Sequence, residues 1–250
     1  MQARRLVVLL AALAATALTA RLGLWQLDRA AQKTAAQQQL DARRALPPLP
    51  AAEWPRRGDA VAAVAQRAVV LEGRWLAEHQ VFLENRPMNG RAGFFALAPL
   101  ALADGSVVLV QRGWLPRDPL DRTRVAAPPP PAGLVRIGGR IVAGPSRLYE
   151  LAPEAAASGP IRQNLDLDEF ARRTGLPLVP FAVAQEDGAP GAAAVADGLL
   201  RQWPAPAADV HKHYGYAFQW FALALLVLGL YVWFQLVKPR RARAARAHGA

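Results

Sequence analysis

The strongest constraint on the fold is one long apolar stretch in the last quarter of the chain. Residues 217–237 are 21 residues in which only Gln219 and Gln235 are strongly polar. As an α-helix this stretch would be about 31 Å long, the thickness of a bilayer's hydrocarbon core. Aromatic side chains gather near both of its ends, as expected at the two membrane–water boundaries. They are Phe218, Trp220 and Phe221 at the start, and Tyr231, Trp233 and Phe234 at the end. The stretch therefore predicts a transmembrane helix.

Basic residues follow this stretch directly, with no acidic residue among them. They are Lys238, Arg240, Arg241, Arg243 and Arg246. Such a flank marks the cytoplasmic side of a membrane helix, so we expect the chain to enter the bilayer from outside, near His213. The net charge is +11, and part of this excess lies beside the apolar stretches. We interpret it as a topology signal, and we expect a lipid bilayer and no nucleic acid as partner.

A second apolar stretch lies near the start, after Arg4 and Arg5. Leu6–Ala20 alone would make a helix of roughly 22 Å, which is too short, but a span that continues to Trp25 is long enough if Arg21 snorkels to the interface. The alternative is a cleaved signal peptide with its cleavage site at residues 15–17. We favour two uncleaved helices, because they place both basic ends in the cytoplasm.

The region between the two stretches has the pattern of short strands broken by turns. The candidate strands are Ala68–Trp75, Gln80–Glu84, Phe94–Leu100, Val107–Gln111, Leu134–Val142, Leu178–Gln185 and Leu199–Trp203. Asp104-Gly105 predicts a turn between the third and the fourth. A short helix is predicted over Leu167–Thr174, capped by Asp166 and ended by Gly175. A polar helix over Trp25–Leu46 is expected to continue the first span outward and to end at Pro47.

The sequence thus predicts an α+β membrane protein in which two transmembrane helices flank one mostly β extracytoplasmic domain. We expect five segments along the chain. They are a cytoplasmic N-terminus (1–5), transmembrane helix 1 (6–27), the β-rich domain (28–212), transmembrane helix 2 with its outer approach (213–237) and a basic cytoplasmic tail (238–250).

The residues that carry chemistry are few. The chain has no cysteine, so disulfides and thiolate chemistry are excluded. It contains none of the nucleophile, zinc-protease or phosphate-loop motifs, so we expect no enzyme. His213, Tyr216 and Trp220 would share one helical face just outside the second span. His213 is therefore a candidate axial ligand for haem iron, and the alternative is an interfacial histidine bonded to water or lipid.

Two arginines are the other candidates. Arg86 closes one predicted strand and Arg112 closes another, the latter just before Gly113 and Trp114. An arginine fork at such a place can hold a carboxylate, for example a haem propionate. The alternative, which we favour, is an internal ion pair that fixes the turn.

Three blocks of residues resemble the Surfeit locus protein 1 family, the membrane assembly factors of cytochrome c oxidase. Residues 22–29 (LGLWQLDR), followed by Lys33, are similar to the family's exit from its first helix. Residues 110–116 (VQRGWLP) resemble its central V-x-R-G-W-x-P block, and residues 213–221 (HYGYAFQWF) resemble the H-x-x-Y-A-x-Q-W-F approach to its second helix. Glycine-containing segments at Gly73 and Gly93, and residues 163–166, fall in the expected order between the blocks.

The resemblance implies a multi-pass protein of the cell inner membrane with its large domain in the periplasm. It implies a role in maturing the haem-bearing subunit I of the oxidase, with subunit I and haem a synthase as partners. Bacterial members are associated with haem a, and the family's proposed ligand corresponds to His213. A second histidine, His211, departs from the family pattern and is an alternative ligand. A scaffold that holds assembly intermediates without binding haem is the rival interpretation, and a membrane-tethered enzyme is a third.

Overall fold

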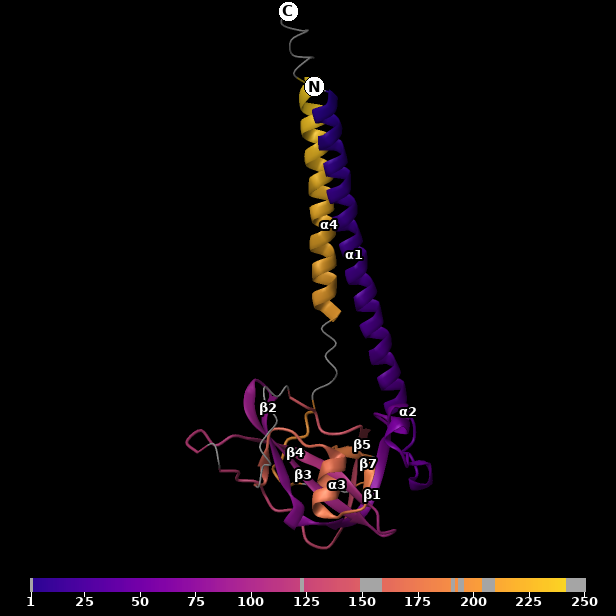
Figure 1. Ribbon diagram of the computed structural model, residues 1–250, viewed down its shortest axis with the longest axis vertical. Helices are drawn as coiled ribbons and strands as arrows, with labels where there is room; N and C mark the ends of the chain where they lie inside the picture. The colour runs from indigo at the N-terminus through magenta and orange to yellow at the C-terminus, as the bar shows by residue number, and fades with distance from the viewer. Residues whose placement is uncertain are drawn as a thin grey trace, which may run out of the picture. The chain divides into compact units, whose positions relative to one another are not determined.

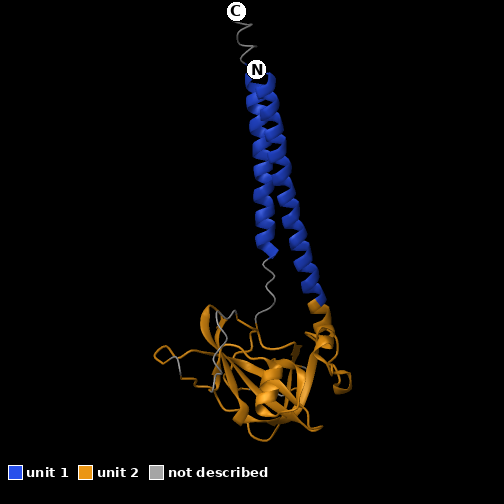
Figure 2. Cartoon of the chain, viewed as in Figure 1, with its two compact units in different colours: residues 1–39, 205–250 blue, residues 40–204 orange. Residues whose placement is uncertain are grey.

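The computed structural model describes residues 2–121, 124–148, 159–189, 192, 196–203 and 210–241. Arg243 and Arg246 of the predicted basic tail lie outside these residues. The chain divides into two compact units, and each is described by itself (Figure 2). One unit joins Met1–Gln39 to Ala205–Ala250, and the other is Leu40–Pro204.

The first unit is a pair of long helices. Helix α1 is Gln2–Arg44, and its last turn belongs to the other unit. Helix α4 is Val210–Tyr231, followed by a π-helical segment, η4, over Val232–Val237. Both helices are long and apolar enough to cross a membrane, and only 11% and 6% of their most apolar windows are buried. A core helix of a soluble protein would be mostly buried, so these exposed apolar surfaces suit a bilayer.

Small residues line the contact between the two helices, which run side by side in opposite directions (Figure 1). The buried residues recur at spacings of four, three and four on α1, and two buried alanines lie seven apart on α4. They are Thr19, Gly23, Gln26 and Ala30 on α1, and Ala217 and Ala224 on α4. Small side chains allow helix backbones to approach closely, which is how helices associate in a bilayer.

The second unit is a β-barrel with short helices around it. Its strands are β1 (Ala68–Trp75), β2 (Val81–Met88), β3 (Arg91–Leu102), β4 (Val107–Pro116), β5 (Leu134–Val142), β6 (Ile161–Arg162) and β7 (Leu178–Gln185). Its helices are η1 (Ala51–Glu53), η2 (Gly58–Ala60), α2 (Val61–Val64), η3 (Ala77–His79) and α3 (Leu167–Thr174). The predicted fold class, two long apolar helices flanking a mostly β domain, is confirmed.

Five strands close the barrel in the order β1-β5-β7-β4-β3, because β1 pairs with both β5 and β3. The pairs are antiparallel except for β4 with β7. The closing pair sets Gly73 of β1 opposite Leu102 of β3. A Cβ at Gly73 would lie 2.3 Å from the carbonyl oxygen of Ala101, so only glycine permits this approach. Strands β2 and β6 extend the sheet beyond β3.

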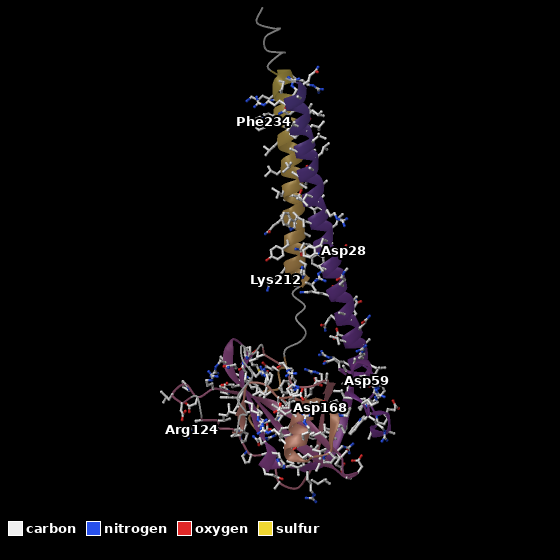
Figure 3. All side chains as sticks on the ribbon, in the orientation of Figure 1. Asp28, Asp59, Arg124, Asp168, Lys212 and Phe234 are labelled. Atoms are coloured by element: carbon white, nitrogen blue, oxygen red, sulfur yellow. The ribbon has the colours of Figure 1, made fainter. Side chains whose placement is uncertain are left out.

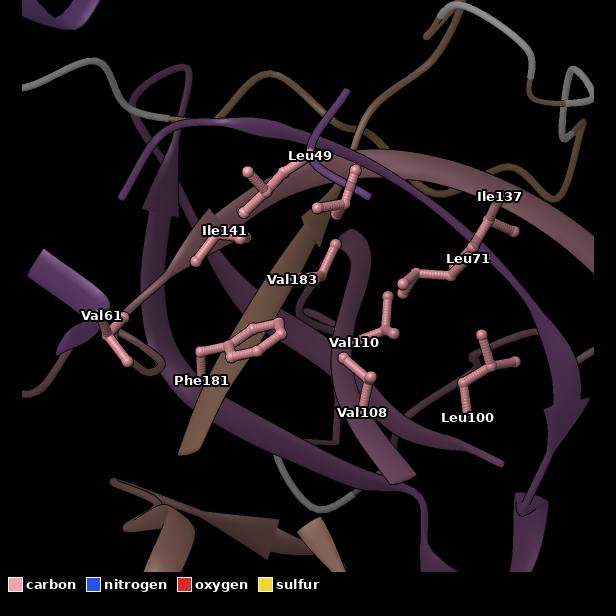
Figure 4. Close-up of a cluster of buried hydrophobic side chains, with 11 residues drawn as sticks. Leu49, Val61, Leu71, Leu100, Val108, Val110, Ile137, Ile141, Phe181 and Val183 are labelled. Atoms are coloured by element: carbon pink, nitrogen blue, oxygen red, sulfur yellow. The ribbon is translucent and has the colours of Figure 1, made fainter. Parts of the chain in front are cut away.

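Apolar side chains fill the barrel and also cover one outer face. Val108 and Val110 of β4 point into the barrel, together with Phe181 of β7 (Figure 4). Leu109, between them, joins a second cluster with Phe170 of α3. Successive side chains of a strand point to opposite faces, and β4 is buried on both, which explains why its first four residues, VVLV, are all apolar.

Four of the predicted elements are found with the expected bounds. Strands β1, β5 and β7 and helix α3 begin and end where the sequence predicted. The side chain of Asp166 accepts a hydrogen bond from the Glu169 amide, and Gly175 ends α3 in the left-handed conformation. The predicted strand over Leu199–Trp203 is wrong, because within it only Leu200 makes a β-bridge, to Trp114.

Candidate functional site

The candidate site in the helix pair centres on a hydrogen bond between residues far apart in the sequence. His213 lies in the first turn of α4, where its Nδ1 is 2.7 Å from Oε1 of Gln26 on α1. Gln26 is 9% exposed, and His213 is half-buried. The contact brings together the first and the third of the blocks described above, and it connects the two candidate spans through polar groups.

The other predicted residues of this site follow along α4. Trp220 is half-buried, seven residues after His213, so the two lie on nearly the same side of the helix as the buried Ala217. Tyr216 is 50% exposed and lies at the edge of this face, by helical geometry about 60° away from His213. His211 is exposed, on the other side of the helix. The structure therefore places His213, Tyr216 and Trp220 on neighbouring positions of one helix surface.

A close approach of the two helices supports this site. A Cβ at Gly23 of α1 would lie 2.8 Å from the ring of Phe221, so the ring occupies the space that a side chain at Gly23 would need. Asp28 and Lys212 add charged side chains at this end of the helix pair (Figure 3). Charge beside long apolar helices is expected at a membrane–water interface, which is where the sequence placed His213.

The other predicted candidate, Arg112, lies in the barrel unit. Ala96 pairs with Gly113 and Leu97 pairs with Gln111, so Arg112 is the extra residue of a β-bulge in β4. Bulges change the direction in which a side chain points, and here the guanidinium is turned toward Asp197. The Arg112 side chain is 1% exposed and its Nη2 is 3.3 Å from Oδ2 of Asp197. The internal ion pair that we favoured from the sequence is therefore present. The prediction that Arg112 closes its strand is wrong, because β4 continues past the bulge to Pro116.

Arg112 belongs to a network of charges. Its Nη1 donates to the carbonyl oxygen of Pro128, and its guanidinium lies 5.5 Å from the ring centroid of Trp75. Asp197 also accepts two hydrogen bonds of 2.7 Å from Arg201. Burial lowers the pKa of Arg112, and Asp197 partly opposes that effect. The nearby Asp197 carboxylate thus favours the charged form of Arg112 against the effect of burial.

A cavity of ≈ 400 Å³ adjoins this network. Its walls include Trp75, Arg112, Asp197 and the side chains of Leu134 and Ile137. A mostly apolar cavity with a few polar groups is the usual form of a small-ligand site. That Arg112 also contacts a ligand in this cavity stays a prediction.

Arg86, the other buried arginine, has neutral hydrogen-bond acceptors as its partners. It is buried inside β2, next to a second bulge in which Asn85 has a φ of 58°. The prediction that Arg86 closes a strand is wrong, because the bulge lets β2 continue to Met88. Its Nη2 donates to the Gln163 carbonyl at 2.7 Å and to Oδ1 of Asn164 at 3.3 Å. It has no ion pair among the described residues, and burial lowers its pKa.

Three functional partners were not found from the sequence. Gln26 was seen only as part of a motif, and Asp197 and Arg201 were assigned no role. Gln26 and His213 are 187 positions apart, and Arg112 and Asp197 are 85 apart. A polar residue within an apolar helix is the one signal that pointed to Gln26, because such residues need a partner.

Comparison with known proteins decides the family. The model of the SURF1 family matches residues 13–225, which run from within α1 to within α4. The chain belongs to the SURF1 family. Uncharacterized SURF1-like proteins of Mycobacterium bovis and Mycobacterium tuberculosis are each 26% identical to it over 231 residues, covering 88% of this chain and 80% of theirs. A SURF1-like protein of Dictyostelium discoideum is 32% identical over 59 residues, covering 24% of this chain and 22% of its own length. The SURF1 match thus includes the barrel and the whole His213 site.

Proposed function

We propose that this SURF1 family member is an assembly factor of cytochrome c oxidase, which presents or stabilises haem a while subunit I matures. The family is linked to oxidase assembly, and this supports the general role. The observation that supports the haem-specific role is the position of His213. This imidazole lies at the polar end of an apolar helix pair, with Trp220 and Tyr216 beside it. We infer that the protein is not an enzyme.

The donor set fits haem. When bound, haem a supplies an iron that accepts an imidazole nitrogen as axial ligand. Of the two nitrogens of His213, Nδ1 is engaged by Gln26, and Nε2 has no hydrogen bond within the described part of the chain. Trp220 and Tyr216 supply aromatic surface on the same helix for an apolar ring. The site lies between the apolar part of the helix pair and the charged side chains of Asp28 and Lys212. Such surroundings suit a ligand with an apolar body and carboxylate arms.

Arg112 is the second proposed contact. A guanidinium can bind a carboxylate through two parallel hydrogen bonds, and Arg112 lines the cavity of the barrel unit. Asp197 already uses part of the hydrogen-bonding capacity of Arg112. We therefore expect Arg112 to contribute less to haem binding than His213 does.

We place the protein in the cell inner membrane as a multi-pass protein with the β-barrel on the periplasmic side. Basic residues beside both apolar stretches support this topology through the positive-inside rule. Subunit I of the oxidase and haem a synthase are the proposed partners.

The test is the haem content of two histidine variants purified from cells that make haem a. His213→Ala should reach the membrane in normal amounts, because an interfacial side chain contributes little to insertion, yet it should lose bound haem a and lower oxidase activity. His211→Ala is the matched control, since it lies on the other side of α4 and should keep its haem.

Three other outcomes would change the proposal. Equal haem in His213→Ala and the parent would reject His213 as the ligand. Loss in His211→Ala alone would move the site by two residues. A parent protein without haem, from cells that make it, would favour a scaffold that holds oxidase intermediates.

A further inference from the structure

We propose that Gln26 is a positioning residue for His213: its amide oxygen holds the imidazole as the Nδ1–H tautomer and leaves Nε2 as the nitrogen that faces a metal. The contact is the 2.7 Å approach of Gln26 Oε1 to His213 Nδ1. The metal-binding part of this inference rests on the proposed function, whereas the choice of tautomer does not.

The geometry decides the direction of the hydrogen bond. An amide oxygen carries lone pairs and no proton, so at this distance the imidazole must donate. The proton then lies on Nδ1, and Nε2 carries the free lone pair. Within the described part of the chain Nε2 has no hydrogen-bond partner that would compete for this lone pair.

The surroundings of Gln26 keep its oxygen in place. Gln26 is 9% exposed and lies on the buried face of α1, between Gly23 one turn before it and Ala30 one turn after it. In a site of low dielectric constant, an unmade hydrogen bond to a buried amide costs more than it would in water. Rotating the amide away from His213 is therefore unfavourable, and the imidazole loses rotational freedom in turn.

This arrangement has a consequence for metal affinity. A histidine ligand that donates its second N–H to an oxygen is a stronger base and is already oriented, and removing such a partner typically lowers metal affinity about 10- to 100-fold. Gln26 is neutral, so it orients His213 without adding a negative charge to the site. A carboxylate at the same position would orient the ring and also make it more electron-donating.

The experiment compares three variants of the full chain in detergent. Gln26→Leu keeps the approximate size and removes the acceptor, Gln26→Glu keeps an acceptor, and Gln219→Leu makes the same change at an exposed position of α4. Two readouts are needed: titration with haem, and ¹⁵N NMR of the histidine side chains without haem. The resonances of His213 are assigned from their absence in His213→Ala.

We expect the parent and Gln26→Glu to show the Nδ1–H tautomer and Gln26→Leu to show a mixture of tautomers. Haem affinity should fall about 10- to 100-fold in Gln26→Leu, stay unchanged in Gln219→Leu and be retained in Gln26→Glu, with a lower reduction potential of the bound haem in the last. If Gln26 had only a structural role, the tautomer of His213 would be the same in Gln26→Leu as in the parent.

Two results would overturn the inference: an Nε2–H imidazole in the parent, or parental haem affinity and tautomer in Gln26→Leu. A parent that binds no haem, but whose Nδ1–H tautomer is lost in Gln26→Leu, would uphold the positioning by Gln26 and reject the proposed function instead. The two failures are thus distinguished in one set of samples.

Discussion

Arg86 and Arg112 show how one β-domain accommodates two buried guanidinium groups. Arg112 is paired with Asp197, whereas Arg86 relies on a carbonyl and an amide oxygen. Arg112 is the extra residue of a bulge in β4, and Arg86 follows directly after a bulge in β2. A bulge interrupts the regular alternation of side chains along a strand. Burial lowers the pKa of both arginines; Asp197 opposes this effect for Arg112, and Glu84 opposes it for Arg86.

Arg112→Ala should lower the free energy of unfolding of the barrel by about 3 kcal/mol, because it removes one partner of a buried ion pair. In this variant Asp197 still pairs with Arg201. The expected loss in free energy of unfolding is therefore near the lower end of the range for broken buried ion pairs. Thermal unfolding followed by circular dichroism measures the effect.

The matched control is Arg57→Ala. Arg57 pairs with Asp59 at 3.2 Å, but the two side chains are 83% and 69% exposed. An exposed pair contributes under about 1 kcal/mol. If Arg112→Ala unfolds like the parent yet loses haem or oxidase assembly, the ion pair is not its main role and Arg112 is a binding residue.

At single positions the sequence indicated which side chains can carry chemistry, but it did not indicate which other side chains they contact. His213 could be selected because an imidazole next to an apolar helix is rare and chemically capable. Asp197 could not be assigned to Arg112, because nothing local connects a bulged strand residue to a carboxylate 85 positions later. Gln26 was similarly hidden, since its role exists only once α1 and α4 lie side by side.

At the scale of elements, local signals set the boundaries well wherever turn chemistry was explicit. Asp166 and Gly175 fixed α3, and the turn predicted at Asp104-Gly105 is the one that joins β3 to β4, with Ser106 bonded to Asp104. The predicted ends of β2 and β4 were wrong, because both strands continue past a bulge, which leaves no such signal. Barrel closure could not be predicted either, because it depends on a pairing between β1 and β3.

Gly73→Ala should strongly destabilise the barrel, by about 3 kcal/mol or more, because the new Cβ would lie 2.3 Å from backbone at the closing pair and backbone cannot move aside. Gly58→Ala is the control, since nothing lies within 4 Å of a Cβ there. Thermal unfolding of both variants measures the difference. Equal midpoints would mean that the β1–β3 pair does not close the barrel in solution.

At the scale of the whole molecule, the distribution of charge predicts the membrane topology. Arginines at positions 4 and 5 precede one apolar stretch, and Lys238, Arg240 and Arg241 follow the other. Two membrane helices return the chain to the side from which it started, so both basic ends can lie in the cytoplasm only if the barrel lies outside. In this proposed topology the His213 end of α4 would lie at the outer surface of the membrane.

We predict that both basic ends are cytoplasmic and that residues 29–212 lie outside. The chain contains no cysteine, so single cysteines can report their side of the membrane without background. In intact spheroplasts, a maleimide that cannot cross the bilayer should label Arg57→Cys and should label Lys238→Cys only after the membrane is opened, because only the barrel faces the outside. Both residues are exposed, so access to the thiol is not limited by the fold. Labelling of Lys238→Cys before opening would reverse the second helix, and a mature protein that begins at Leu18 would show that the first stretch is a cleaved signal peptide.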